Sequence, residues 1–174
     1  MKTLLLMRHA KSAWSDPRLD DHDRPLNKRG ERAAKTMADH LAHHAPRPDL
    51  ILCSTAMRTR QTLAAVLDRL GPPRPAISLT SNLYLASKEA LLAQLQAMPD
   101  DMNVVLLIAH NDGIGELAAL LAGTGPSDAL ARLREKYPTG ALTILQPGQT
   151  RWSDLAPQTA KLLDFVRPRD LSSV

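Results

Sequence analysis

The 174-residue sequence has a single cysteine and very few aromatic residues. One thiol cannot form an internal disulfide, so Cys53 is typical of a chain in a reducing compartment, and we expect a cytoplasmic protein. Aromatic residues make up 3% of the chain, so leucine, alanine, valine and isoleucine must form most of the core. Base-stacking platforms for nucleic acids depend on aromatic side chains, so nucleic acid is not an expected partner.

Long apolar runs and long runs of like charge are also missing. No segment approaches the roughly 20 apolar residues that a membrane helix needs, and charges at Arg8 and Lys11 interrupt the apolar start of the chain. We therefore expect neither a membrane span nor a targeting peptide. The net charge of +4 comes from Lys and Arg scattered among acidic residues. The length suits one globular domain over residues 1–174.

Short apolar runs alternate with segments of helical periodicity. This alternation predicts a three-layer α/β/α domain with a mainly parallel sheet. The last two strands flank a turn at Pro147-Gly148, and we expect them to form an antiparallel pair at a sheet edge. The expected strands are Thr3–Met7, Asp49–Cys53, Ala76–Thr80, Asn103–Ala109, Ala141–Leu145 and Thr150–Leu155, and the expected helices are Lys28–His44, Met57–Leu70, Lys88–Met98 and Gly113–Ala122.

Three polar clusters follow three of these strands. Arg8-His9 follows the first strand, Ser54–Arg58 follows the second, and His110-Asn111 follows the strand Asn103–Ala109. Ligands of open parallel sheets bind outside the carboxyl ends of the strands, where these clusters should meet. An arginine fork can hold a phosphate or carboxylate, and a neutral imidazole can attack what the fork holds. The sequence therefore predicts an anion site with phosphoryl chemistry on a histidine.

Each of these residues also has a structural interpretation when it is taken alone. Arg8 can cap a strand or pair with an acid, and a histidine at a strand end is often structural. Arg58 near a helix start is unfavourable for the helix dipole, which favours a bound anion there. His110 precedes a helix that begins near Gly113, so backbone N–H groups point into the same space. Together the four side chains favour the anion site.

Two other site chemistries fit the sequence less well. A cysteine-based phosphatase needs five residues between its cysteine and arginine, whereas four separate Cys53 from Arg58. A metal held by His9, His110 and Asp112 would be repelled by the neighbouring arginines. A helix face with three further histidines is better explained as solvated than as a metal site; these are His40, His43 and His44. We expect no metal and no organic cofactor.

The motifs resemble those of the histidine phosphatase superfamily, the phosphoglycerate mutase-like proteins. The segment Leu4–Trp14 resembles the first motif, with Ala10 in place of the usual glycine after Arg-His. Ser54–Thr62 resembles the second motif with its Gln-Thr ending, and His110-Asn111 resembles the third. Asp23–Gly30 is similar to the segment before the first long helix. The Arg-His-Ala variant, the short length and the segment Leu83–Ser87 indicate the SixA-type phosphohistidine phosphatase branch.

The resemblance implies a role for each matching position. His9 would be the nucleophile that becomes phosphorylated, and Arg8, Arg58 and His110 would hold the phosphoryl oxygens, with His110 donating when protonated. Many relatives carry a proton-donating glutamate after the third strand, but the matching stretch of this chain has no acid. Glu89 and Asp112 are the nearest substitutes. Further phosphate or substrate contacts are expected from Lys11, Ser15, Arg24 and Asn111.

We therefore expect a histidine phosphatase that hydrolyses phosphorylated substrates through phospho-His9 without a cofactor. Its partner would be a phosphorylated protein, most simply one carrying phosphohistidine, or a small phosphorylated molecule, and we expect a monomer. The alternative is a phospholigand-binding regulatory module of low turnover, which the missing glutamate supports and the intact His9 opposes. A mutase is a third option, which the short chain opposes. The polar loop Ser12–Leu26, directly after the Arg-His pair, is expected to be functional.

Overall fold

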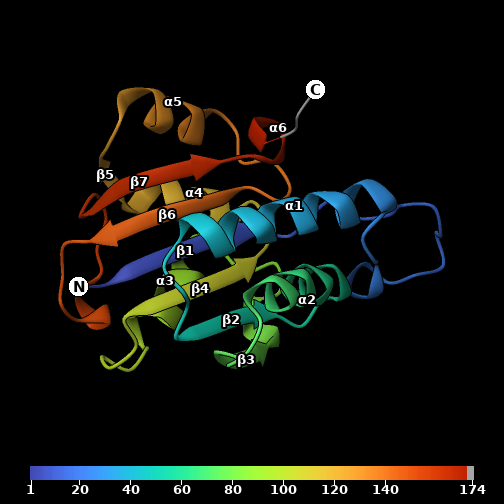
Figure 1. Ribbon diagram of the computed structural model, residues 1–174, viewed down its shortest axis with the longest axis horizontal. Helices are drawn as coiled ribbons and strands as arrows, with labels where there is room; N and C mark the ends of the chain where they lie inside the picture. The colour runs from blue at the N-terminus through green and yellow to red at the C-terminus, as the bar shows by residue number, and fades with distance from the viewer. Residues whose placement is uncertain (172–174) are drawn as a thin grey trace.

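The computed structural model describes residues 1–171 and contains a seven-stranded sheet. The strands lie in the order β3-β2-β4-β1-β6-β7-β5 (Figure 1). Helices cover both faces of this sheet, which confirms the predicted α/β class. The strands are β1 (Thr3–Arg8), β2 (Leu50–Ser54), β3 (Ala76–Thr80), β4 (Val104–Ala109), β5 (Ala122–Thr124), β6 (Leu142–Pro147) and β7 (Ala160–Val166).

The sheet is mainly parallel, as the sequence predicts. β3, β2, β4 and β1 pair in parallel, and β5 pairs in parallel with β7. β6 runs antiparallel to both of its neighbours, β1 and β7. The antiparallel strand is therefore inside the sheet and not at its edge, because β7 and β5 extend the sheet beyond it.

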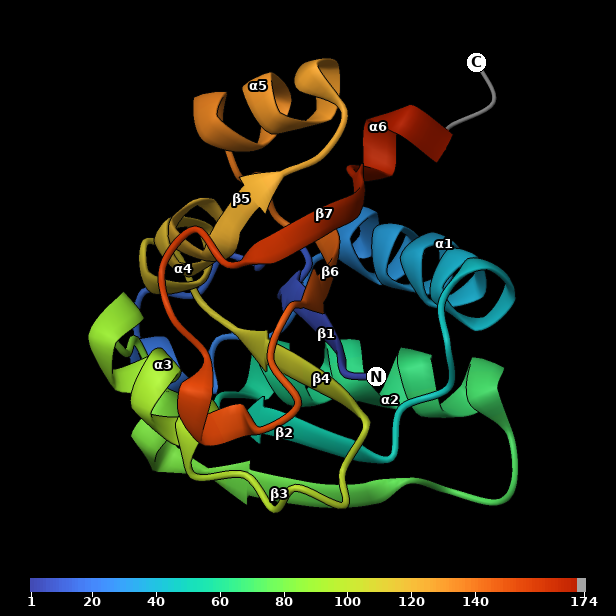
Figure 2. The same cartoon turned by 90° about the vertical axis from the view of Figure 1, so that its left-hand side faces the viewer.

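Two groups of helices flank the sheet (Figure 2). The helices are α1 (Lys28–His44), α2 (Met57–Leu70), α3 (Lys88–Gln96), α4 (Gly113–Leu121), α5 (Ser127–Glu135) and α6 (Pro168–Leu171). α1 begins at the N-cap Asn27, whose side chain accepts a hydrogen bond from Gly30 N–H. None of the helices in residues 1–171 is long and apolar enough to cross a membrane.

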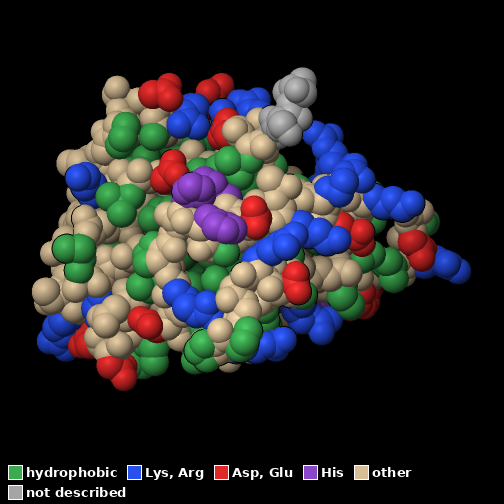
Figure 3. Space-filling model, viewed as in Figure 1, with side chains coloured by type: hydrophobic (Ala, Val, Ile, Leu, Met, Phe, Trp, Pro, Cys, Tyr) green, Lys and Arg blue, Asp and Glu red, His purple; other side chains and the backbone are tan. Residues whose placement is uncertain are grey.

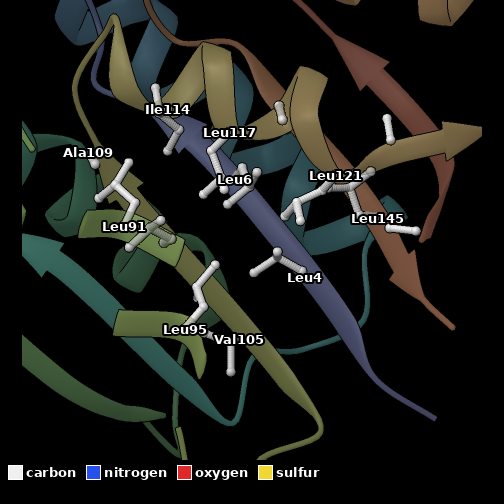
Figure 4. Packing of buried hydrophobic residues seen from close by; sticks show 14 of the residues in the cluster. Leu4, Leu6, Leu91, Leu95, Val105, Ala109, Ile114, Leu117, Leu121 and Leu145 are labelled. Carbon is white, nitrogen blue, oxygen red and sulfur yellow. The ribbon is translucent and has the colours of Figure 1, made fainter. Parts of the chain in front are cut away.

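Strand alternation divides the core between the two faces of the sheet. Leu4 and Leu6 of β1 belong to the cluster formed with α3, α4 and α5, whereas Leu5 and Met7 belong to the cluster formed with α1 and α2. Figure 4 shows the first cluster. Leu91 and Leu95 of α3, with Leu117 and Leu121 of α4, lie over β1 and β4. This packing fixes the strands whose ends carry the polar clusters.

The predicted strand at Thr150–Leu155 is wrong. This segment contains a short 3-10 helix (Trp152–Asp154), and the strand that pairs with β6 is β7. Trp152 is 1% exposed, and its indole N–H donates to the carbonyl of Met102 at 2.6 Å, so its apolar bulk anchors a loop instead of a strand. β7 (AKLLDFV) does not alternate strictly between apolar and polar residues, so its sequence gave only a weak strand signal.

Candidate active site

A pocket of about 270 Å³ opens at the carboxyl ends of β1, β2 and β4. We call it the central pocket. Arg8 ends β1 and His9 follows it, Arg58 lies in the first turn of α2, and His110 follows β4. The structure thus brings the four main predicted residues together around one cavity. Its walls are formed by Arg8, His9, Lys11, Ser12, Trp14, Arg58, Leu85, His110, Asn111 and Thr139.

The two ring nitrogens of His9 have different partners: one forms a hydrogen bond to the backbone, and the other forms a hydrogen bond with Arg58. Arg58 Nε donates to His9 Nε2 at 3.3 Å, so Nε2 carries no proton. The proton therefore lies on Nδ1, which donates to the Ala10 carbonyl at 2.6 Å. Burial, with the charges of Arg58 and Arg8, lowers the pKa of His9 from 6.5 to about 4. His9 is thus neutral, and the Nε2 lone pair accepts the hydrogen bond from Arg58.

Arg58 is almost entirely buried, and four of its five N–H groups have partners within the described chain. Besides Nε, its NH1 donates to the Asp21 carbonyl at 2.7 Å and its NH2 donates to Asp21 Oδ2 at 2.9 Å. The same carboxylate oxygen accepts from Tyr84 Oη at 2.5 Å. These hydrogen bonds outweigh the burial of the carboxyl group, and the pKa of Asp21 falls below its ordinary value. Asp21 therefore fixes the orientation of the guanidinium.

His110 lies beside His9, with 5.2 Å between the ring centroids. Its Nδ1 lies 3.3 Å from Arg58 NH2, and a guanidinium can only donate, so Nδ1 accepts. Nε2 then carries the proton and donates to Ser54 Oγ at 2.7 Å. Burial, with the nearby His9 and Arg58, lowers the pKa of His110 to about 3. The imidazole is therefore neutral in this arrangement, and the additional donor that His110 would provide when protonated is not present here.

Arg8 reaches the pocket from the end of β1. Its NH1 donates to the Tyr137 carbonyl at 3.0 Å, while its buried Nε has no hydrogen-bond partner among the described residues. Burial lowers the pKa of Arg8 from its ordinary value. A buried guanidinium N–H without an acceptor is costly, and an anion in the pocket would compensate for part of this cost. Asn111 Nδ2 donates to the same Tyr137 carbonyl at 2.9 Å.

The additional predicted contacts divide into two groups. Lys11 and Asn111 line the central pocket, whereas Ser15 is exposed and Arg24 does not line the pocket. The Arg24 guanidinium lies 3.8 Å from the centroid of the Trp14 ring, and its Nε lies 3.7 Å from Asp21 Oδ1. Arg24 therefore supports the wall of the pocket from behind.

Sequence reasoning missed several residues of the site. Ser12, Trp14, Leu85 and Thr139 line the pocket without having been proposed as contacts. Asp21 was also missed, because an acid in a polar loop carries no local signal that it will pair with an arginine 37 residues away. The available signal was the position of the loop Ser12–Leu26, directly after the Arg-His pair.

The Gln-Thr ending of the second motif has a structural use. Gln61 Oε1 accepts from Leu26 N–H at 2.7 Å. Thr62 Oγ1 accepts from Ala10 N–H at 3.1 Å and donates to the Arg58 carbonyl at 2.8 Å. These bonds join α2 to both ends of the loop that follows His9. They therefore hold the two motifs in register.

No acidic side chain lines the central pocket in the described part of the chain. Glu89 and Asp112 are both exposed and outside its walls. Within residues 1–171, no group of three His, Cys, Asp or Glu is arranged to hold a metal ion. The site consists instead of the buried guanidinium of Arg58, the partly buried guanidinium of Arg8, two neutral imidazoles and backbone carbonyls that orient these groups.

Comparison with known proteins agrees with this geometry. Residues 4–83 match the model of the histidine phosphatase superfamily (branch 1). An uncharacterized protein of Mycobacterium tuberculosis is 37% identical over 165 residues, covering 94% of this chain and 100% of its own length. The chain also resembles a structure assigned to phosphohistidine phosphatase SixA of Nakamurella multipartitia, with 32% identity, a TM-score of 0.83, and 96% of each chain covered.

A second structure, assigned to phosphohistidine phosphatase SixA of Agrobacterium tumefaciens, is 33% identical with a TM-score of 0.79, covering 96% of this chain and 98% of that one. The chain therefore belongs to the histidine phosphatase superfamily, an enzyme class. Within that superfamily it lies in the SixA-type branch.

Proposed function

We propose that this histidine phosphatase acts through a phosphohistidine intermediate on His9 and removes the phosphoryl group from phosphohistidine in a protein partner. The observation that carries the proposal is the state of His9, a neutral imidazole in the wall of the central pocket. Its Nε2 carries no proton and accepts a weak, 3.3 Å hydrogen bond from Arg58, which a phosphoryl oxygen can take over as Nε2 attacks. Such a nitrogen can attack phosphorus without first losing a proton.

In the first step, His9 Nε2 forms a bond to phosphorus, and the bond between phosphorus and the leaving group breaks. Arg8 and Arg58 neutralise the charge of the phosphoryl oxygens, and Asn111 and Lys11 lie close enough to assist. In the second step, water attacks phosphorus, and the electron pair of the P–N bond returns to Nε2. Both hydrogens of the water leave with the inorganic phosphate, so His9 is again neutral. The Nδ1–H bond to Ala10 keeps the ring oriented throughout.

The absence of an acid from the described pocket walls bears on the leaving group. Proton donation to a leaving group is commonly worth about 10²–10⁴ in rate. Imidazole and nitrophenolate need little such help, whereas the alkoxide of phosphoserine needs it. We therefore expect phosphohistidine to exceed phosphoserine by at least about a hundredfold in kcat/KM.

The rim of the pocket supports a protein as the substrate. Trp14 and Leu85 both line the pocket, yet they are 70% and 54% exposed. Exposed apolar side chains at the mouth of a polar site are typical of a surface that contacts another protein. We also propose a cytoplasmic location, which the buried free thiol of Cys53 supports, and one domain over residues 1–174.

The test is to trap the intermediate. Wild type, His9→Ala and His43→Ala would each be mixed with labelled phosphoramidate and quenched, and the protein-bound label would be followed in acid and in base. Wild type and His43→Ala should carry an acid-labile, base-stable adduct, because His43 lies exposed on α1 away from the pocket. His9→Ala should carry none and should lose turnover while it remains folded.

Near-normal turnover by His9→Ala would contradict covalent catalysis on His9. A wild-type adduct that forms but is hydrolysed no faster than free phosphohistidine would favour the low-turnover binding module instead. Comparable rates on phosphohistidine and phosphoserine peptides would show that a proton donor reaches the leaving group, and Asp112 and Glu89 would then be the first residues to replace.

A further inference from the structure

A second pocket, of about 300 Å³, adjoins the central pocket. Lys11 and Thr139 belong to the walls of both. We call the second one the basic pocket, because its only acidic wall residue is Glu135 in the described chain. Its cationic wall residues are Lys11, Arg29, Arg132, Lys136, Arg167 and Arg169. Figure 3 shows Lys and Arg side chains gathered beside α6 and the N-terminal end of α1.

The cations of the basic pocket divide into neutralised and free groups. Arg132 pairs with Asp128 at 3.0 Å and Asp170 at 3.5 Å, and Arg167 pairs with Asp170 at 2.7 Å. Four other side chains form no hydrogen bond or ion pair within residues 1–171: Lys11, Arg29, Lys136 and Arg169. Like charges in one concavity repel each other, so an anion bound there would relieve the repulsion.

The wall between the two pockets is firmly placed. Asn27 N–H donates to the Lys11 carbonyl at 3.0 Å, and α1 packs so closely that a Cβ on Gly30 would lie 2.0 Å from that oxygen. On the other side, Gly140 N–H is shared between the carbonyls of Arg8 and His9, at 3.2 and 2.9 Å. The basic pocket itself therefore lies at a fixed position relative to His9.

We propose that the basic pocket binds acidic side chains of the phosphorylated protein, next to the residue that carries the phosphoryl group. This inference rests on the proposed function and specifies its substrate. The free cations are all exposed and come from separate elements of the fold. Exposed, flexible cations suit carboxylates on a protein surface. A site for a second phosphate would instead be expected to contain arginines held in fixed orientations, with their guanidinium groups directed at one point, as in the central pocket.

The experiment compares two phosphohistidine peptides of equal length, one with Asp and Glu beside the phosphohistidine and one with Asn and Gln. Wild type should prefer the acidic peptide by about tenfold in kcat/KM, mainly through KM, since each exposed pair contributes about two- to fivefold. The double variant Arg29→Gln/Arg169→Gln removes two of the four free cations and should lower this ratio at least about threefold. Its kcat/KM on p-nitrophenyl phosphate, which is too small to fill both pockets, should stay within about twofold. The preference should weaken as salt is added.

Arg74→Gln is the matched control. Arg74 is an exposed arginine just before the edge strand β3. It lies at the amino ends of the parallel strands, opposite to the carboxyl ends that form the central pocket, and it lines neither pocket. It should keep the full preference for the acidic peptide. Equal kcat/KM for the two peptides in wild type, or a preference in the double variant as large as that of wild type, would overturn the proposal.

Inorganic pyrophosphate and an unphosphorylated acidic peptide provide a second measurement by direct binding. The double variant should bind the acidic peptide at least about fivefold more weakly than wild type does. If only pyrophosphate binding weakened, the pocket would be a phosphate subsite and the proposal would be wrong. Absence of turnover on every substrate would refute the proposed function alone, because peptide binding still reports on the basic pocket.

Discussion

Two neutral histidines buried among arginines should make the protein sensitive to mild acid. His9 and His110 have pKa values of about 4 and about 3, below the ordinary 6.5. Between these values and 6.5, the unfolded chain binds protons that the folded chain does not. The contribution of these histidines to the free energy of unfolding is therefore fully present above pH 6.5, the pKa of histidine in the unfolded chain. It is lost as the pH falls through this window. Burial also lowers the pKa of His40, which acts in the same direction.

The magnitude follows from the shifts. One pKa unit corresponds to about 1.4 kcal/mol, and only the part of each shift that lies above the working pH counts. Between about pH 7 and about pH 4.5, His9 and His110 should each remove about 2 kcal/mol from the free energy of unfolding. A typical domain has about 5–15 kcal/mol in total, so this loss is large. Asp21 and Asp170, whose pKa values are lowered, add to the loss only at more acidic pH.

The assay is urea unfolding at several pH values from about 7 to about 4.5, followed by circular dichroism. His9→Asn and His110→Asn should each have a shallower dependence on pH than wild type, by about 2 kcal/mol over the range. His43→Asn is the control and should keep the wild-type slope, because this imidazole is exposed to water in the folded protein.

A free energy of unfolding that stays constant over this range in wild type would refute the reasoning. The same conclusion would follow if His9→Asn and His110→Asn kept the wild-type slope, since the protons would then be taken up elsewhere.

Three further predictions concern single residues. Arg58→Ala should lower kcat/KM on p-nitrophenyl phosphate by about 10²–10³, and Arg58→Lys should restore it only in part, because an ammonium lacks the planar fork; equal kinetics for all three would place Arg58 away from phosphate. Asp21→Asn should lower kcat about tenfold, since Arg58 loses a charge-assisted hydrogen bond; an unchanged kcat would mean that Arg58 is oriented without it. Gly30→Ala should destabilise the protein by about 1–3 kcal/mol in urea unfolding, because its Cβ would collide with the Lys11 carbonyl; a gain in stability, the usual result of adding alanine to a helix, would show that the loop can move.

The part of the fold that carries the site could be predicted from the sequence. β1, β2 and β4 are apolar runs buried on both faces, and each ends at a polar cluster, so local pattern and position agree. The sequence therefore predicted that Arg8, His9, Arg58 and His110 lie together at the carboxyl ends of these strands.

The last third of the chain was harder to predict. β7 carries Lys161 and Asp164 among its apolar residues, which weakens its strand pattern. Trp152 and Leu155 are apolar residues typical of a strand, but they are the buried residues of a short 3-10 helix and its C-cap. The short α5 (Ser127–Glu135) was also missed. The role of Asp21 depends on a contact between distant segments, which no local pattern encodes. Each of these features depends on which residues are buried and on contacts between segments far apart in the chain, so local sequence patterns could not predict them.

The shared wall at Lys11 and Thr139 has a consequence for inhibitor design. A molecule with a phosphate-like head and a carboxylate tail would occupy both pockets at once. Its second contact would form at a high effective concentration, without the entropic cost of a separate binding event. Much of the basic pocket comes from the end of α5 and from Arg167–Arg169, beyond the residues 4–83 that the superfamily model matches. The tail of such an inhibitor would therefore recognise a part of this enzyme that lies outside the shared catalytic motifs.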